Sequence, residues 1–358
     1  VMRAGIVIFG IGFLLFSRIN TLPTFYATFM LMAVGASLSG FMSLMTTVVN
    51  WFERRRATAM SITQTGMSVG GLMVPLVAWS LSEFGWRATS FTSGLIVIVV
   101  GLPLVQLMRT SPEQYGLLPD GAVPDASREG DSPSTMVGER PEAKVEFTPK
   151  QAMRTRAFWF IGFGHALAVM VVSAVMVHLV IHLNEGLGFS VTAAATLVAV
   201  MTAITMVGQL AGGFLGDRFD KRKIATVAMF GHAAGLLALA WGTSLAWVLV
   251  FAVLHGTAWG MRGPLMQAMR ADYFGRKSFS MIMGFSSMIT MLGMMSGPII
   301  AGLMADAFGN YRYGFTVLAI FAACGSLFFL FATKPTPPGM PAGEPSLRLS
   351  PSASGGGD

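Results

Sequence analysis

The stretch GGFLGDRFDKRK, residues 212 to 223, stands between two long apolar runs and carries six charged side chains in its last seven positions. Only 11% of the residues in the chain are charged, whereas soluble domains have about 25%, and 53% are hydrophobic. Apolar segments long enough to cross a hydrocarbon core of about 30 Å recur along nearly the whole sequence. This composition indicates a multi-pass membrane protein whose charges gather in its loops.

Ten apolar segments predict membrane-spanning helices, because a backbone inside lipid must satisfy its own hydrogen bonds. The short alternating segments typical of barrel strands are absent from the sequence. The fold class expected is therefore all-α and polytopic. The spans are expected at residues 4–20, 23–50, 57–82, 87–108, 157–183, 190–215, 224–244, 246–270, 279–303 and 313–333.

Basic residues are distributed unequally between the two sides of these spans. When the spans alternate in direction, 20 of the 24 Lys and Arg residues fall on the side that holds both chain ends and the turn at 218–223. An excess of basic residues marks the cytoplasmic side, so both termini are expected in the cytoplasm. Basic loops beside anionic lipid account for the net charge of +7, and nucleic-acid binding is not expected.

One long polar segment, residues 110–156, divides the chain into two blocks. The first block, residues 1–109, has four spans, and the second block, residues 157–333, has six. The segment is rich in Pro, Gly, Ser, Asp and Glu, which predicts a flexible cytoplasmic linker. The tail, residues 334–358, is expected to be disordered by composition.

The two blocks carry related sequences. NWFERRRATAMSI at 50–62 resembles DYFGRKSFSMIMG at 272–284, and EFGWR at 83–87 resembles AFGNYR at 307–312. At this offset, the counterpart of Asp217 would precede the first residue of the chain. The first block is therefore expected to lack two helices, and the sequence to be truncated at its N-terminus.

Two repeats joined by a long loop, with G-x-x-x-D-R-x-x-x-R-K between two helices, resemble the major facilitator superfamily of secondary transporters. The resemblance implies two pseudo-repeated bundles, of which helices 3–6 and 7–12 of twelve are visible, and transport by alternating access. At one position the sequence departs from the pattern, since Asp220 stands where the family usually has glycine. The pattern is matched at Gly213, Asp217, Arg218, Arg222 and Lys223.

The charges of this turn suggest a mechanical role. Asp217 can face the positive N-terminal end of a neighbouring helix, while Arg218 and Arg222 can reach carboxylates or C-terminal carbonyls. The expected counterpart of Asp217 is the helix that begins near Arg56 and is preceded by Glu53. The resemblance implies a gating turn that keeps the cytoplasmic side closed; the alternative is that these charges only set the topology.

Glycine and proline occupy matching positions in two spans, Gly70 and Pro75 in the first block and Gly297 and Pro298 in the second. Kinks are tolerated in membrane helices, because neighbouring groups satisfy the freed backbone. These four residues are candidate hinges. Close helix packing is the alternative for each glycine.

A charge in the middle of a membrane span is costly and usually faces a polar cavity or a ligand. Arg262 is such a charge, and His255 and Trp259 lie on the same helical stripe. A guanidinium can hold a carboxylate through two hydrogen bonds, so this stripe is predicted to bind the substrate, with Gln64 as a further polar candidate. The alternative for Arg262 is pairing with a structural partner.

His178 and His182 are four residues apart and can share one helix face. The ordinary titration range of histidine makes them candidates for proton coupling, and packing is the alternative. Their spacing resembles that of a zinc-binding helix but lacks a third ligand, so no metal is expected. No cofactor is expected either.

Several passages are similar to bacterial monocarboxylate-transporter-like and oxalate/formate-antiporter-like members of the superfamily: NWFERRRATAMSI, FGWR, SAVMVHLVIHLNEGLGFS and ADYFGRKSFSMIMG. The resemblance implies a small mono- or dicarboxylate moved across the bacterial inner membrane by proton coupling or exchange. The chain lacks the Asp-Arg pair that vertebrate-type monocarboxylate transporters carry in the eighth helix and the lysine that oxalate/formate exchangers carry in the eleventh. Efflux of amphipathic compounds is the alternative, and no enzyme motif is present.

Overall fold

The computed structural model describes residues 1–122 and 146–338, and all secondary structure within these ranges is helical. This confirms the predicted all-α class. The first block contains α1 (Met2–Phe16), α2 (Leu22–Ser39), α3 (Phe41–Trp51), α4 (Arg56–Leu72), α5 (Val74–Ile96), the π-helical turn η1 (Val97–Gly101) and α6 (Leu102–Leu107). The second block contains α8 (Arg156–Ile181), the π-helical turn η5 (His182–Gly186), α9 (Val191–Arg218), α10 (Lys221–Trp241), α11 (Leu245–Phe274), α12 (Phe279–Phe308) and α13 (Arg312–Phe331).

Eight helical segments in the described ranges are long and apolar enough to span a membrane, where the sequence predicted ten. Helix α1 falls short because it ends at Phe16, after which the Ser17 hydroxyl donates to the Leu14 carbonyl. The span expected at 57–82 is divided at Met73. Pro75 lies in the first turn of α5 and has no N–H with which to extend the hydrogen-bond ladder of α4.

Two glycines at repeat-related positions make the same kind of turn. Gly85 has a φ of 75° and interrupts α5, and Gly309 has a φ of 69° and ends α12. Glycine adopts positive φ without the steric cost of a Cβ. Both occupy the third position of the matched segments EFGWR and AFGNYR, so this part of the sequence repeat is also a structural repeat.

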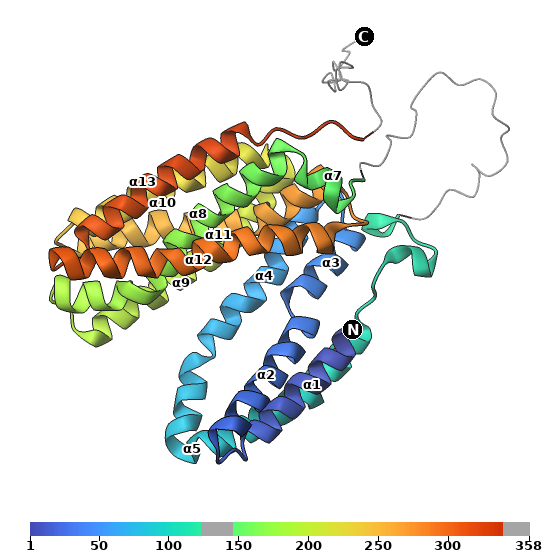
Figure 1. Ribbon diagram of the computed structural model, residues 1–358, viewed down its shortest axis with the longest axis horizontal. Helices are drawn as coiled ribbons and strands as arrows, with labels where there is room; N and C mark the ends of the chain where they lie inside the picture. The colour runs from blue at the N-terminus through green and yellow to red at the C-terminus, as the bar shows by residue number, and fades with distance from the viewer. Residues whose placement is uncertain (123–145, 339–358) are drawn as a thin grey trace, which may run out of the picture.

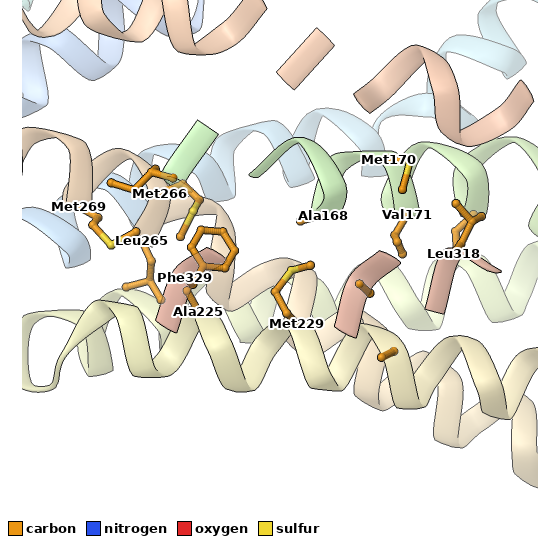
Figure 2. Close-up of a cluster of buried hydrophobic side chains, with 14 of the residues drawn as sticks. Ala168, Met170, Val171, Ala225, Met229, Leu265, Met266, Met269, Leu318 and Phe329 are labelled. Atoms are coloured by element: carbon orange, nitrogen blue, oxygen red, sulfur yellow. The ribbon is translucent and has the colours of Figure 1, made fainter. Parts of the chain in front are cut away.

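The second block has a continuous apolar core, and Figure 2 shows part of it between α8, α10, α11 and α13. Small residues let its helices approach closely. A Cβ added at Gly293 or Gly297 of α12 would collide with the carbonyl oxygens of Ala166 and Met170 on α8. Helix α12 runs unbroken through Gly297 and Pro298, so close packing accounts for this glycine better than the expected hinge.

The two blocks meet at one end of the molecule, which we call the charged end and define by the turns at residues 52–56, 217–223 and 272–278. Figure 1 shows α3 and α4 approaching the second block there, near α7 (Pro149–Met153), while α1, α2 and α5 diverge from it. Ala57 and Met60 in the first half of α4 are buried. Around Gly70, in the second half, no atom lies within 4 Å of an added Cβ.

Candidate functional site

Asp217, in the last turn of α9, caps the N-terminus of α4. Its carboxylate oxygens accept hydrogen bonds from the backbone N–H groups of Ala57, at 2.8 Å, and Thr58, at 2.9 Å. The first N–H groups of a helix have no partner within that helix, and its N-terminus favours a negative charge. The predicted contact between Asp217 and the helix beginning near Arg56 is therefore confirmed, and it joins the second block to the first.

Gly213 and Gly216 allow α9 to lie close enough to α4 for this contact. A Cβ on Gly213 would collide with the side chain of Ser61 and would lie 2.9 Å from the carbonyl oxygen of Ala57. A Cβ on Gly216 would lie 3.0 Å from the Cβ of Ala57. Larger side chains at either position would hold Asp217 away from the helix it caps.

A polar seam continues along the same face of α4, farther from Asp217. Ser68 donates a hydrogen bond of 3.0 Å to the side-chain oxygen of Gln209 on α9. The side-chain oxygen of Gln64 lies 2.6 Å from where a Cβ on Gly263 of α11 would stand. Helix α4 therefore touches both α9 and α11 through small and polar residues.

Asp272, near the end of α11, connects the blocks a second time. Its carboxylate pairs with the Arg56 guanidinium of the first block and, at 2.8 Å, with the Lys221 ammonium of the second. Arg56 is only 6% exposed and also donates from Nε to the carbonyl oxygen of Phe52. Sequence reasoning missed Asp272, although it is the acidic residue of the repeat segment ADYFGRK.

Arg276, in the turn between α11 and α12, makes a third connection. Its guanidinium donates to the carbonyl oxygen of Asn50 at 2.9 Å and to Glu113 at 3.1 Å, and it lies 3.6 Å from Glu53. Glu113 belongs to the short helix η2 (Pro112–Tyr115) of the linker. A backbone hydrogen bond lowers the pKa of Glu113 most, and Ser111 and Arg276 lower it further against the effect of burial.

Both described ends of the linker dock onto the repeat-related turns of the two blocks. Asp120 accepts from two consecutive backbone N–H groups in the turn before α4, at 3.3 and 3.0 Å. Glu146 does the same in the turn before α12, at 3.4 and 3.0 Å. These hydrogen bonds anchor the two described ends of the segment expected to be a flexible linker. Residues 123–145, and residues 339–358 of the tail, lie outside the described ranges.

The other basic residues of the gating turn stay within the second block. The Arg218 guanidinium stacks on the ring of Phe214, 3.4 Å from its centroid, and Lys223 is exposed. Arg222 pairs with Asp220 at 2.9 Å, and Asp220 also caps α10 by accepting from the Arg222 N–H. Burial raises the pKa of Asp220, but the hydrogen bonds and charge of Arg222 outweigh it, so this pKa is lowered.

Arg262 is buried inside the second block, with an exposed fraction of 2%. Its Nε and Nη1 atoms have no hydrogen-bond partner in the described part of the chain. Burying a charge without compensation costs several kcal/mol. The alternative expected for Arg262 was pairing with a structural partner, and no described residue provides such a partner for these two atoms.

The other predicted substrate residues are only partly brought together with Arg262. His255 turns toward α10, where its Nδ1 lies 3.1 Å from Nδ1 of His232, and its ring centroid lies 6.4 Å from that of the half-buried Trp259. Gln64 lies against Gly263, the residue that follows Arg262, and within the described ranges its Nε2 is buried without a partner. Gln64 therefore approaches α11 beside Arg262, whereas His255 is paired with His232 inside the second block.

Arg270 is a buried cation that sequence reasoning placed at the cytoplasmic end of the span expected at 246–270 and did not single out. It belongs to α11, is 2% exposed, and donates to the Ser286 hydroxyl at 3.0 and 2.7 Å and to the Met266 carbonyl at 3.0 Å. It also lies 3.1 Å from Nδ1 of His165. A guanidinium only donates, so His165 accepts through Nδ1 and is neutral. The sequence signal that could have revealed this buried cation is its position eight residues after Arg262 on the same helix.

His178 and His182 bind structural partners. His178 contacts the Tyr311 hydroxyl through Nδ1, at 3.1 Å, and the Pro298 carbonyl through Nε2, at 3.0 Å. Nε2 of His182 lies 3.1 Å from the Leu239 carbonyl. These contacts tie α8 to α12 and η5 to α10, which favours the packing alternative for both histidines.

The fold and this interface define a polytopic helical membrane protein whose two repeated blocks touch at a charged end. The profile described as the Major Facilitator Superfamily matches residues 1–164 and 161–354. The chain therefore belongs to the major facilitator superfamily. It is an integral, multi-pass membrane protein and a secondary transporter of a small molecule, not an enzyme.

Relatives and solved structures agree with this assignment. The chain is 25% identical to the "Probable hexose phosphate transport protein" of Chlamydia muridarum, over 97% of this chain and 77% of that one. It is 27% identical to Monocarboxylate transporter 13 of Rattus norvegicus, over 91% of this chain and 71% of that one. The E. coli fucose:proton symporter FucP superposes with a TM-score of 0.68 at 15% identity, covering 93% of this chain and 84% of that one. The human organic anion transporter MFSD10 superposes with a TM-score of 0.66 at 15% identity, covering 92% of this chain and 76% of that one.

Proposed function

We propose that this transporter carries a small organic anion and that Arg262 binds it. The observation that carries the proposal is a buried guanidinium with two nitrogen atoms unpaired in the described ranges. A carboxylate or phosphate brought by the substrate would supply the missing acceptors, and a planar guanidinium suits both. Monocarboxylates and hexose phosphates, named for two of the relatives, are both anionic.

The neighbours of Arg262 suggest how a bound anion would involve both blocks. Gln64 comes from the first block and lies against Gly263, and its free amide N–H groups can donate to the same anion. Trp259 stands one turn away on α11 and offers an apolar face for the rest of the substrate. A ligand held between the blocks can bias their relative position, as alternating access requires.

The described state is closed at the charged end, through Asp217, Asp272 and Arg276. The concentration of basic residues there favours a cytoplasmic location for this end and for both termini. These contacts must then break for the transporter to open inward. Gly70 and Pro75, on either side of the break at Met73, are the better candidates for a hinge.

The experiment uses the purified protein in proteoliposomes with radiolabelled mono- and dicarboxylates and a hexose phosphate. Wild type is expected to take up one of these anions, and Arg262→Gln to lose at least tenfold in initial rate at low substrate concentration. Arg18→Gln is the matched control, because Arg18 is exposed and lies outside the charged end. Normal uptake by folded Arg262→Gln would refute the binding role. Uptake of cationic amphiphiles but of no anion would instead support the efflux alternative.

A further inference from the structure

Two histidines face each other inside the second block, where apolar packing alone would not require them. His232 on α10 and His255 on α11 are both fully buried, with ring centroids 4.6 Å apart and Nδ1 atoms 3.1 Å apart. Their Nε2 atoms are buried too, and neither has a partner in the part of the chain that the structure describes. Polar groups left unpaired in an interior are costly, so the pair calls for an explanation.

The contact between the two Nδ1 atoms fixes where protons can be. In a neutral pair, one Nδ1–H donates to the lone pair of the other Nδ1. The donating ring then carries a bare lone pair on its Nε2, and the accepting ring carries its proton on Nε2. An added proton can bind the bare Nε2, and the bond between the rings becomes charge-assisted and stronger. The pair is therefore built to hold one extra proton.

The charge that faces the pair is Arg262. It follows His255 by seven residues, which is roughly 10 Å along a helix. The next cation on α11 is Arg270, in contact with His165 of α8. The helices α9 and α13, which pack on α10 and α11, carry their charged side chains only near their ends.

An anion on Arg262 would change the electrostatic balance at the pair. Without it, a second positive charge on the imidazoles is opposed by Arg262. With it, the guanidinium is neutralised and the opposition disappears. At an effective dielectric constant of about 20, unit charges roughly 10 Å apart alter each other's binding by about tenfold. By linkage, a proton on the pair favours the anion by the same factor.

We propose that the His232 and His255 pair is the proton-binding site of this transporter and that it fills together with the anion site at Arg262. The inference rests on the proposed anion function. It assigns to this pair the coupling role that the sequence suggested for His178 and His182. Anion and proton then cross together with less net charge than either has alone, which describes symport.

Two transport assays separate this inference from the proposed function. Exchange of labelled for unlabelled anion at equal pH needs anion binding and the conformational cycle, but no net proton release. Uphill uptake driven by an imposed pH gradient needs the proton site as well. His232→Asn and His255→Asn each retain an amide that can bond to the remaining imidazole. We expect both variants to keep exchange within about twofold at saturating anion, where the linked loss of affinity has no effect, and to lose at least tenfold in gradient-driven accumulation.

The matched control is His178→Asn, which changes a histidine of the same block with partners on both ring nitrogens. It should keep accumulation and exchange in their wild-type ratio. Because a tenfold coupling shifts the proton affinity of the pair by one pH unit, adding the anion to purified wild type in weak buffer should also remove up to about half a proton per protein from solution at the pH of greatest effect. The pair variants should not do this. Normal accumulation in the variants, or loss of exchange together with accumulation in folded variants, would overturn the inference. Absence of anion exchange in wild type would overturn the proposed function and this inference with it.

Discussion

Replacing Asp217 with asparagine is the most direct test of the contact that closes the charged end. The change removes the negative charge and leaves one oxygen, so one of the two N–H groups of α4 loses its acceptor. A hydrogen bond to a charged group contributes about 1.5–3 kcal/mol, and helix-terminal charge about 0.3–1. A loss of about 2 kcal/mol would shift the ratio of open to closed charged ends about thirtyfold.

The distance between the blocks at the charged end reports this shift. Spin labels can be placed at residues 54 and 223, since Arg54 and Lys223 are exposed and lie in different blocks. The exposed native cysteine would first be removed by Cys324→Ala. Pulsed electron–electron double resonance in lipid nanodiscs should show a single short distance between the two labels in the parent. In Asp217→Asn it should show a second, longer distance as well.

The matched control is Asp220→Asn, the same substitution three residues away. Asp220 caps α10 and pairs with Arg222, both within the second block. It should therefore leave the distance between the blocks unchanged. An unaltered distance distribution in Asp217→Asn, together with normal transport, would show that this cap does not hold the charged end closed.

Two further predictions concern the same end. Asp272→Asn should weaken the closed state by about 2 kcal/mol, because it leaves the nearly buried Arg56 without its carboxylate; the spin-label pair should report opening, and a closed distribution would argue against this bridge. The pKa of Asp220 is lowered by its hydrogen bonds with Arg222 in spite of burial, so its stabilisation is complete above its ordinary pKa and is lost as the pH falls through the lowered value. Thermal unfolding of wild type in acid should accordingly converge with that of Asp220→Asn, and a constant difference at all pH values would contradict the assignment.

The sequence predicted those features that depend on one segment and its chemistry. The internal repeat was predicted from the match around Phe52 and Phe274 and from the glycines at 85 and 309. The contact of Asp217 with the start of α4 was predicted because a helix N-terminus attracts a carboxylate. At Met73 the sequence predicted a hinge at Gly70 and Pro75 but not the division into two helices, because hydropathy is insensitive to a single interruption in an apolar run.

The residues that sequence reasoning missed depend on the register between helices. Asp272 finds Arg56 only because α11 ends beside α4, and His232 finds His255 only in the packing of α10 on α11. Arg270 was expected to be the last residue of its span, whereas α11 continues four residues beyond it, to Phe274. A charge near the end of a span cannot be placed inside or outside the bundle without knowledge of its neighbours.

The two kinds of packing in this structure suit a transporter that moves by rigid blocks. Within the second block, glycines of α12 contact carbonyls of α8 and the core is apolar, so a change in register would clash at several points. Between the blocks, the contacts at the charged end are caps, ion pairs and hydrogen bonds, and most of their groups are exposed or half-buried, with Arg56 the buried exception. Each is worth only about 1–2 kcal/mol. A few such contacts together approach the roughly 5.5 kcal/mol needed to reverse a two-state population, which a bound ligand can supply. These magnitudes fit the proposal that the contacts of the charged end close it in this state and that substrate binding can open it.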